Sequence, residues 1–255
     1  MRPRVRAATA LLFLSLRTRG VWGLAAAPPS KGLQSATHIC RPPIHVSDGH
    51  AYGLNDFSLP NHYKGTLLDV LIPSGLLKDR AKKLGQDILE DYDGETIHLL
   101  CILKGGSTFF NHLSTALGAQ HEHSKQAYVP YTFGFCRIQS YQGTESTGTV
   151  LISGMDTSEL AGKHVLVVED IVDTGRTLSA LVPQLESHGA LSVRVAAMLE
   201  KRLSSGPAAF QAHYTGFSIP DKFVVGYGMD YEDIFRDLEH LCTIAPEGVE
   251  RFKRE

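Results

Sequence analysis

The sequence predicts an α/β fold in which a twisted, mainly parallel sheet is flanked by helices. Residues 97–102 and 165–168 are short apolar runs, as expected for strands buried on both faces of a parallel sheet. Each run leads through a glycine-containing turn into a stretch of helical character, which begins at Ser107 in one case and covers residues 178–187 in the other. The chain has 255 residues and 43% hydrophobic content, which is enough for one α/β domain of ordinary size.

Two acids come directly after the apolar run at residues 165–168. They are Glu169 and Asp170, and successive side chains of a strand point to opposite faces of a sheet. Both carboxylates can therefore serve one ligand only where the strand is ending, so we expect the strand to end here. The carboxyl ends of parallel strands are where such folds bind their ligands.

A turn rich in hydrogen-bond donors follows at residues 173–177, with the sequence Asp-Thr-Gly-Arg-Thr. Its amides, two hydroxyls and one cation would lie at the start of the helix at 178–187, where an anion is favoured. Acids beside such a phosphate cradle suggest a ligand with a phosphate and polyol hydroxyls, such as a sugar phosphate. The alternative is that the turn only caps the helix, because Asp and Thr are common there.

Further polar clusters follow the other predicted strands. They lie at residues 103–106, at 137–148 after a strand-like stretch at 131–136, at Lys201 and Arg202 after the apolar run 193–199, and at 219–231 and 235–237. Together with the motif at 165–177 and the segments 60–63 and 72–80, these clusters resemble those of type I phosphoribosyltransferases. The closest resemblance is to the animal-type hypoxanthine-guanine phosphoribosyltransferases, and it covers residues 44–252.

This resemblance implies the type I phosphoribosyltransferase fold, with a small hood formed by parts of residues 44–65 and 219–242. It divides the chain into a leader or unrelated extension at 1–43 and a phosphoribosyltransferase domain at 44–255. The implied activity is purine salvage, the Mg²⁺-dependent transfer of a 5-phosphoribosyl group from phosphoribosyl pyrophosphate to hypoxanthine or guanine. The products would be IMP or GMP and pyrophosphate.

The resemblance also assigns residues to the sugar, pyrophosphate and metal. Lys104, Gly105 and Arg236 would bind pyrophosphate, and Glu169 and Asp170 would bind the ribose hydroxyls directly or through a metal. The substrate-binding segment continues through Ile171, Val172, Asp173, Thr174, Gly175, Arg176 and Thr177, of which the last five would hold the 5-phosphate. Mg²⁺ is expected at Asp230, with Glu169 and Asp170 as further metal ligands.

The remaining assignments concern the purine. Asp173 is the implied catalytic residue, as the proton acceptor for the attacking base. Lys201 would donate to a 6-oxo group and disfavour adenine, whose amino group would place a donor opposite a donor. Phe223 would stack on the ring, although taken alone it is equally well explained as a core aromatic. The backbone groups of Lys222 and Val224 would read the remaining edge.

A flap and an oligomer are also expected from the resemblance. Ser140 and Tyr141 lie in a polar segment without apolar periodicity, which would close over the reacting centre and exclude water. Relatives in this family form dimers or tetramers, so we expect a homodimer or a homotetramer.

Composition limits the other functions of the chain. The formal net charge of −2, without a basic helix or a Cys/His finger, argues against a nucleic-acid partner. Nothing after residue 43 approaches the length of a membrane span. The four cysteines form no C-x-x-C pair, which favours buried thiols in a reducing compartment: Cys40, Cys101, Cys136 and Cys242.

The first 43 residues leave localisation open. They are rich in arginine, and no acid precedes Asp48. The short apolar run at 7–16 is typical of a secretory signal, the acid-free arginine-rich character is typical of an organelle transit peptide, and a wrongly predicted first exon is a third explanation. The expected location is the cytoplasm, which is the usual one for the family.

Two other functions compete with purine salvage. One is a catalytically weak nucleotide-binding paralogue, since animals carry a close relative in which glycine replaces the third acid of the motif. Here that acid, Asp173, is present. The other is an RNA-binding regulator on the same fold, for which the sequence offers no basic face.

Overall fold

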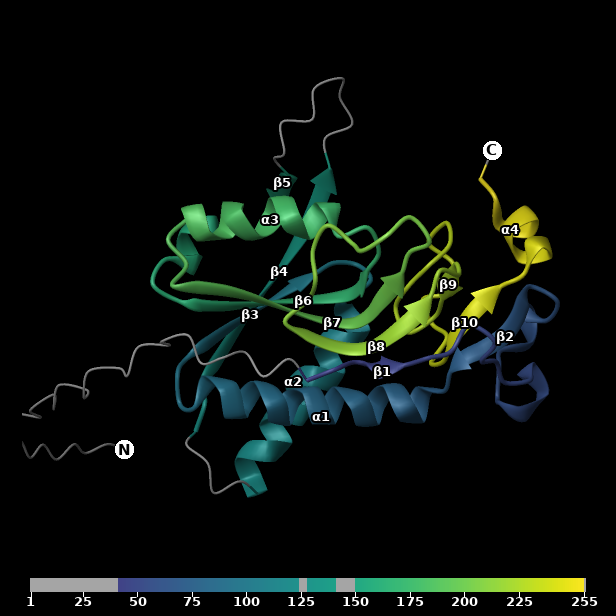
Figure 1. Cartoon of the computed structure of the whole chain (residues 1–255), viewed down its shortest axis with the longest axis horizontal. Helices are drawn as coiled ribbons and strands as arrows, with labels where there is room; N and C mark the ends of the chain where they lie inside the picture. Colours follow the sequence, from purple (N-terminus) through teal and green to yellow (C-terminus); the bar gives the residue numbers. More distant parts are fainter. Residues whose placement is uncertain (1–40, 124–127, 141–149, 255) are drawn as a thin grey trace, which may run out of the picture. The chain divides into compact units, whose positions relative to one another are not determined.

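A seven-stranded sheet forms the centre of the computed structural model, which describes residues 41–123, 128–140 and 150–254 (Figure 1). The strand order is β1-β8-β7-β6-β3-β4-β5, and every neighbouring pair is parallel except β4 and β5. The strands are β1 (Ile44–His45), β3 (Ile97–Ile102), β4 (Tyr131–Ser140), β5 (Val150–Ser153), β6 (His164–Val172), β7 (Ser192–Arg202) and β8 (Tyr214–Pro220). The predicted fold class, a mainly parallel sheet flanked by helices, is confirmed.

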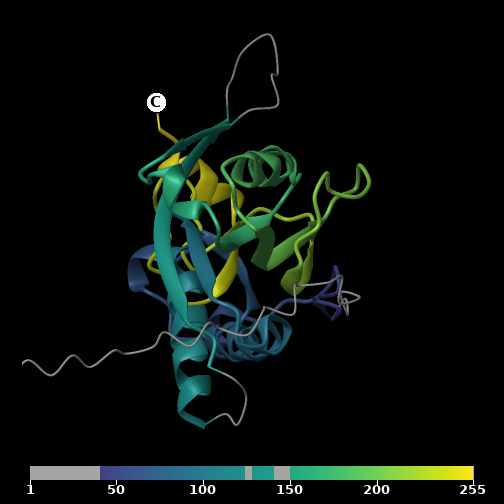
Figure 2. The ribbon, with the colours of Figure 1, turned by 90° about the vertical axis from the view of Figure 1, so that its left-hand side faces the viewer.

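Helices cover both faces of this sheet (Figure 2). On one face, α1 (Ser74–Tyr92) and α2 (Ser107–His123) pack against each other and against the strands. On the other face lies α3 (Arg176–Ser187). Helix α1 buries Leu77, Ala81, Leu84 and Ile88, and α3 buries Leu178, Leu181 and Leu185. This spacing of three and four residues places the apolar side chains on one stripe of each helix, so burial against the sheet holds the helices in place.

The central strands are buried as the apolar runs predict. All six residues of β3 are buried, and Val165, Leu166, Val167 and Val168 of β6 are fully inaccessible. Strands flanked by helices on both faces are apolar throughout. The two strands therefore form a rigid base whose carboxyl ends carry the polar clusters.

A second, antiparallel sheet lies beyond the carboxyl edge of the first. It contains β2 (Leu67–Ile72), β10 (Leu241–Ile244) and β9 (Val224–Val225), and is followed by α4 (Pro246–Phe252). Short 3₁₀ helices complete the described residues: η1 (Leu54–Asp56), η2 (Asn61–Tyr63) and η3 (Thr157–Leu160). The second sheet has its own hydrophobic core, which includes Tyr63 and Phe235, whose stacked rings have centroids 4.6 Å apart. This unit presents the loop after β9 to the main sheet, where a Cβ added to Gly228 would lie 2.5 Å from the Gly105 carbonyl oxygen.

The prediction of buried thiols is confirmed for the three cysteines that the structure describes. Cys101, Cys136 and Cys242 are free and buried, and burial raises the pKa of each thiol to about 12. Cys40 lies outside the described residues. Among the helices described, none is both long and apolar enough to cross a membrane.

Candidate active site

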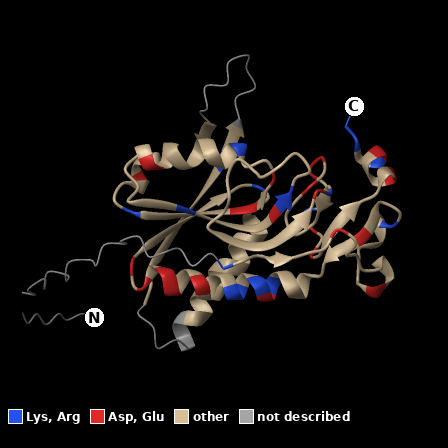
Figure 3. Ribbon diagram, in the orientation of Figure 1, with Lys and Arg blue, Asp and Glu red and all other residues tan. Residues whose placement is uncertain are grey.

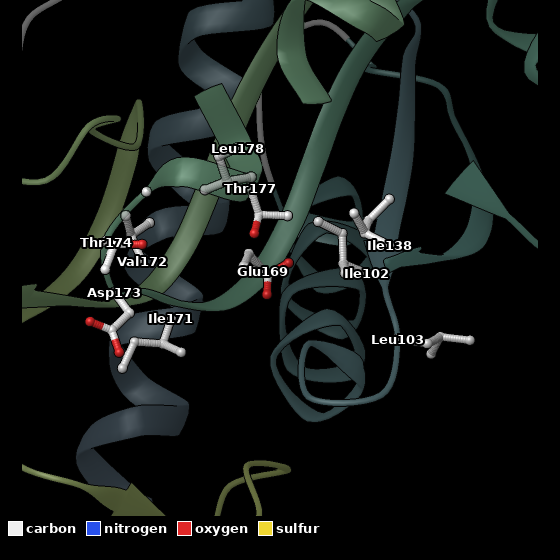
Figure 4. Close-up of a pocket in the computed structure, with 11 residues that line it drawn as sticks. Ile102, Leu103, Ile138, Glu169, Ile171, Val172, Asp173, Thr174, Thr177 and Leu178 are labelled. Carbon is white, nitrogen blue, oxygen red and sulfur yellow. The ribbon is translucent and has the colours of Figure 1, made fainter. Parts of the chain in front are cut away.

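The carboxyl end of β6 opens into a cavity of about 300 Å³ (Figure 4). Glu169 points into it from β6, and Thr177 approaches from the first turn of α3. Its lining comes from the ends of β3, β4 and β6 and from the turn before α3: Ile102, Leu103, Ile138, Glu169, Ile171, Val172, Asp173, Thr174, Gly175, Thr177 and Leu178. The predicted cradle therefore surrounds a real hollow. Arg176, in contrast, is exposed and is not part of this lining.

The turn before α3 is fixed from behind by a neighbouring loop. Gly175 has a φ of 73°, a left-handed conformation that glycine adopts readily. A Cβ at this position would lie 2.5 Å from the amide nitrogen of Phe210, and the Ala209 amide donates to the Thr174 carbonyl oxygen at 2.8 Å. No side chain caps α3, so its first amides are available to an anion.

The two acids of β6 both have raised pKa values, and Asp170 is buried whereas Glu169 is partly buried. Burial of its carboxyl group, reinforced by the neighbouring Asp170 carboxylate, raises the pKa of Glu169 well above its ordinary value, and its buried Oε2 atom has no hydrogen-bond partner among the described residues. Asp170 is 8% exposed, and burial also raises its pKa, although hydrogen bonds and the charge of Arg236 oppose this. An unpartnered carboxylate oxygen in a cavity is a site that needs a donor or a cation.

Close packing joins Asp170 to the loop after β3. A Cβ added to Gly105 would lie only 1.7 Å from Asp170 Oδ2, and one added to Gly106 would lie 2.7 Å from the Ile102 carbonyl oxygen. The peptide bond between Leu103 and Lys104 is cis. A side chain at Gly106 would clash with the backbone of β3 and β6, and one at Gly105 would displace the Asp170 carboxylate.

Basic and acidic residues both occur in the segments at this edge of the sheet (Figure 3). Lys104 Nζ donates to Asp233 Oδ1 at 2.7 Å, and Arg236 Nη2 lies 2.6 Å from Asp230 Oδ1 and 3.0 Å from Asp233 Oδ1. Arg236 also donates from Nη1 to the Gly228 carbonyl oxygen, and its buried Nε has no partner. The hydrogen bonds from Lys104 and Arg236 lower the pKa of Asp233 to about 2.

A second ion pair lies at the end of β7. Lys201 Nζ is 2.9 Å from Asp173 Oδ2, and the lysine side chain is 11% exposed whereas that of Asp173 is 50% exposed. The register pairs Val172 with Glu200, one residue before Lys201. Neighbouring parallel strands thus bring together an acid and a cation that are 28 positions apart in sequence.

Phe223 directly precedes β9, and the residue is 53% exposed. It meets the Tyr231 ring edge-on at 5.7 Å, while the following Val224 is buried and pairs with Thr243. A core aromatic would be buried, so its exposure favours a surface that takes a flat ligand.

Comparisons with known proteins agree with this geometry. A family model described as a phosphoribosyl transferase domain matches residues 73–232, more than half of the chain. This chain belongs to the phosphoribosyltransferase family. The hypoxanthine-guanine-xanthine phosphoribosyltransferase of Plasmodium falciparum is 44% identical over 215 residues, covering 83% of this chain and 92% of that protein.

Other relatives point the same way. The hypoxanthine-guanine phosphoribosyltransferase of Bos taurus is 42% identical over 214 residues, covering 83% of this chain and 97% of that protein. A crystal structure of the Schistosoma mansoni hypoxanthine-guanine phosphoribosyltransferase with IMP matches with a TM-score of 0.71 and 32% identity, covering 83% of this chain and all of that one. The fold is therefore the type I phosphoribosyltransferase fold.

Some expectations about this phosphoribosyltransferase need correction. The strand carrying Glu169 and Asp170 does not end at these acids but continues to Val172, because β7 pairs with it as far as Glu200. Helix α3 begins at Arg176 and not at residue 178. The strand expected at 131–136 extends to Ser140, because β5 pairs with its second half.

The predicted flap and metal ligands have different outcomes. Ser140 is the last residue of β4, and Tyr141 lies outside the described residues. Within the described ranges, no group of three or more His, Cys, Asp or Glu side chains could hold a metal ion. Glu169, Asp170 and Asp230 therefore do not form a metal cage on their own.

Sequence reasoning missed two contributors to the site of this phosphoribosyltransferase. Asp233 contacts both Lys104 and Arg236, and the Ala209–Phe210 pair packs behind the phosphate turn. Asp233 lies between two residues that the sequence did assign, Asp230 and Arg236, so it could have been suspected. The Ala209–Phe210 pair lies in a loop whose sequence gives no signal of its role.

Proposed function

We propose that this protein transfers the 5-phosphoribosyl group of phosphoribosyl pyrophosphate to hypoxanthine or guanine, forming IMP or GMP and pyrophosphate. The observation that carries the proposal is the Lys201–Asp173 pair, 2.9 Å apart, in which Asp173 lines the cavity at the end of β6. A cation that suits a 6-oxo group and a carboxylate that can accept a proton stand beside a cradle for a sugar phosphate. The names of relatives at 41–44% identity agree with it.

The 5-phosphate would lie in the turn from Asp173 to Thr177. The amides at the start of α3 and the hydroxyls of Thr174 and Thr177 would donate to its oxygens. Because Phe210 and Ala209 already hold this turn, little conformational entropy is lost when the phosphate binds. Glu169 and Asp170 would accept hydrogen bonds from the ribose hydroxyls.

The pyrophosphate would lie between the lysine loop and the loop after β9. Lys104 and the Gly105 amide would bind it on one side, and the Arg236 guanidinium, with its unpartnered Nε, on the other. These residues belong to segments that contact each other at Gly228 and Gly105.

Mg²⁺ fits this site only as an ion shared with the substrate. Asp230, with Oδ2 bonded to the Asp233 amide, and the unpartnered Glu169 Oε2 are hard oxygen donors, and Mg²⁺ commonly binds through one or two carboxylates plus phosphates and waters. When bound, the ion would offset the charge of the leaving pyrophosphate.

The purine would lie between Phe223 and Lys201. The exposed Phe223 ring offers a stacking face, and Lys222 and Val224 would contribute backbone groups. With a 6-oxopurine bound, Lys201 would donate to the oxo group while Asp173 accepts the proton that the attacking nitrogen loses. Adenine would present an amino group to Lys201 and bind poorly.

A flap at Ser140 and Tyr141 remains a proposal by family resemblance. It would extend the end of β4 over the cavity that Ile138 already lines, and exclude water from the activated sugar.

We also propose a homo-oligomer, with a dimer as the minimal unit and a tetramer as the expected form. Phe133 and Phe135 on β4 are 58% and 39% exposed, and both rings lie within 6 Å of Phe110, which follows the lysine loop. Exposed aromatic clusters commonly mark interfaces. Sedimentation at micromolar concentration tests this; a fully active monomer on dilution would refute it.

The cytoplasm remains the proposed location, and imaging of a C-terminally tagged full chain tests it.

The test of the activity is a steady-state assay of the full chain with hypoxanthine, guanine, xanthine and adenine. We expect turnover of hypoxanthine or guanine and none of adenine. Asp173→Asn should reduce kcat by about 10²–10⁴-fold while phosphoribosyl pyrophosphate still binds. An inactive wild-type protein that binds nucleotide would instead support the catalytically weak paralogue.

A further inference from the structure

One carboxylate oxygen engages both cations that face the pyrophosphate position. Asp233 Oδ1 accepts from Lys104 Nζ at 2.7 Å and from Arg236 Nη2 at 3.0 Å. Lys104 and Asp233 are 129 positions apart in sequence, so this is a tertiary contact between two loops. An anion bound by Lys104 and Arg236 would compete with Asp233 for the same donors.

The position of Asp233 is set by its backbone. Its amide donates to Asp230 Oδ2 at 2.8 Å, and its φ of 63° lies in the left-handed region, as does that of Glu232. A tight turn in which Tyr231 and Ile234 exchange hydrogen bonds encloses both residues. A short side chain on a fixed turn has few rotamers, so the carboxylate is held toward the cations.

A third cation lies at the other oxygen of the same carboxylate. Arg254 Nη2 is 3.5 Å from Asp233 Oδ2 and donates to the Glu232 carbonyl oxygen at 3.0 Å. Arg254 is well exposed and is not part of the pyrophosphate position. If the Oδ1 atom of Asp233 lost its contacts with Lys104 and Arg236, Arg254 would still neutralise the carboxylate.

We infer that Asp233 is an internal counter-anion of the pyrophosphate position, displaced when pyrophosphate or the pyrophosphoryl end of the substrate binds, with Arg254 as its alternative partner. The inference rests on the proposed function. It makes Asp233 an affinity-setting residue: an anion must present enough charge to take both cations from it. Pyrophosphate does so, and a single inorganic phosphate does so less well. The same competition would assist pyrophosphate release after transfer.

A purely structural role explains the contacts less well. The side chains of Lys104 and Asp233 are 51% and 41% exposed, and exposed ion pairs contribute little to stability. Removing Asp233 should therefore leave the fold intact, while it frees Lys104 and leaves Arg236 paired with Asp230 alone.

The test is calorimetric titration of inorganic pyrophosphate, with Mg²⁺ and at low ionic strength, into the full chain and its variants. Asp233→Asn keeps the size and tolerates the left-handed backbone, and should bind pyrophosphate about fivefold more tightly, as expected for releasing two exposed ion pairs. Arg254→Gln should bind it about twofold more weakly, because Asp233 then stays with Lys104 and Arg236. In the Asp233→Asn background, Arg254→Gln should have no further effect.

Glu239→Gln is the control. It removes one negative charge from the same segment between β9 and β10, but Glu239 pairs with Lys78, which has no part in the proposed exchange, so pyrophosphate affinity should stay unchanged. In turnover, Asp233→Asn should lower both the KM for phosphoribosyl pyrophosphate and kcat, because pyrophosphate leaves more slowly; a structural defect would raise KM.

The outcomes separate the inference from the proposed function. Equal or weaker pyrophosphate binding by Asp233→Asn, with wild-type binding intact, would overturn the inference and leave the function standing. An equal gain in Glu239→Gln would show a general charge effect and also overturn it. If neither wild type nor Asp233→Asn binds pyrophosphate, both proposals fall.

Discussion

The two anion-binding regions of this molecule are built differently. The turn from Asp173 to Gly175 is fixed by backbone geometry and by the Ala209–Phe210 contact, and it offers amides. The region around Lys104 and Arg236 consists of charged side chains that already hold carboxylates. The proposed phosphate position is thus preformed, whereas the proposed pyrophosphate position would exchange partners. The arrangement suits a reaction in which the phosphate stays with the product and the pyrophosphate leaves.

Gly105→Ala should have the largest effect, because this glycine joins the two regions. A Cβ would lie 1.7 Å from Asp170 Oδ2, so the lysine loop and the acid must separate. We expect kcat/KM to fall about 100-fold, as for misplacement by about 1 Å. The control is Gly118→Ala in α2, where the nearest atom is 3.7 Å away. Equal loss in both variants would remove the steric explanation.

Gly175→Ala tests whether the phosphate turn is preformed. The added Cβ would lie 2.5 Å from the Phe210 amide nitrogen at a φ of 73°, and the KM for phosphoribosyl pyrophosphate should rise about tenfold, equivalent to about 1.4 kcal/mol. Gly162→Ala has nearly the same φ, 72°, with nothing within 4 Å, and so reports backbone strain alone. Its KM should be unchanged; a similar rise there would show that packing by Phe210 is unimportant.

Glu169→Gln should stabilise the protein at the expense of function. Burial raises the pKa of Glu169 in the folded state, so the folded protein binds its proton more strongly. The stability that this group contributes is full below its ordinary pKa and is lost as pH rises through the raised value. The variant should match wild type in Tm near pH 4 and exceed it at pH 8. Each kcal/mol corresponds to about 2–4 °C, and a Tm difference independent of pH would contradict this.

Added salt should weaken ligand binding to the two regions to different extents, an effect smaller than those of the substitutions. Exposed charges are screened over a Debye length of about 10 Å at 0.1 M. The proposed pyrophosphate position is built from two charged side chains, of which Lys104 is 51% exposed, whereas the phosphate turn offers mainly backbone amides. Inhibition by pyrophosphate should therefore weaken more steeply with added salt than inhibition by ribose 5-phosphate. Parallel slopes for the two inhibitors would remove this difference between the regions.

The phosphate turn was predictable because its chemistry lies in one continuous segment. The apolar run before Glu169, the acids and the turn to Thr177 are adjacent in sequence, and the structure places them around one cavity. Where the strand ends was not predictable, because the length of β6 depends on its pairing with β7 as far as Glu200. Apolar content reports burial, but it does not report how far a neighbouring strand extends.

The pyrophosphate region could be predicted only in part. Lys104 and Arg236 were assigned from their motifs, but the contact of both with Asp233 depends on how two loops 129 positions apart meet. The contact of Phe210 with Gly175 depends likewise on a loop between β7 and β8. Local motifs indicate which groups bind a ligand; the groups that hold or compete with them come from tertiary structure.

The most direct test of the central claim measures nucleotide and pyrophosphate together in one reaction of the full chain with hypoxanthine, phosphoribosyl pyrophosphate and Mg²⁺. We predict IMP and pyrophosphate in equal amounts, formed over many turnovers and only when the base is present. Pyrophosphate released without IMP, or binding of both substrates with neither product, would contradict the account.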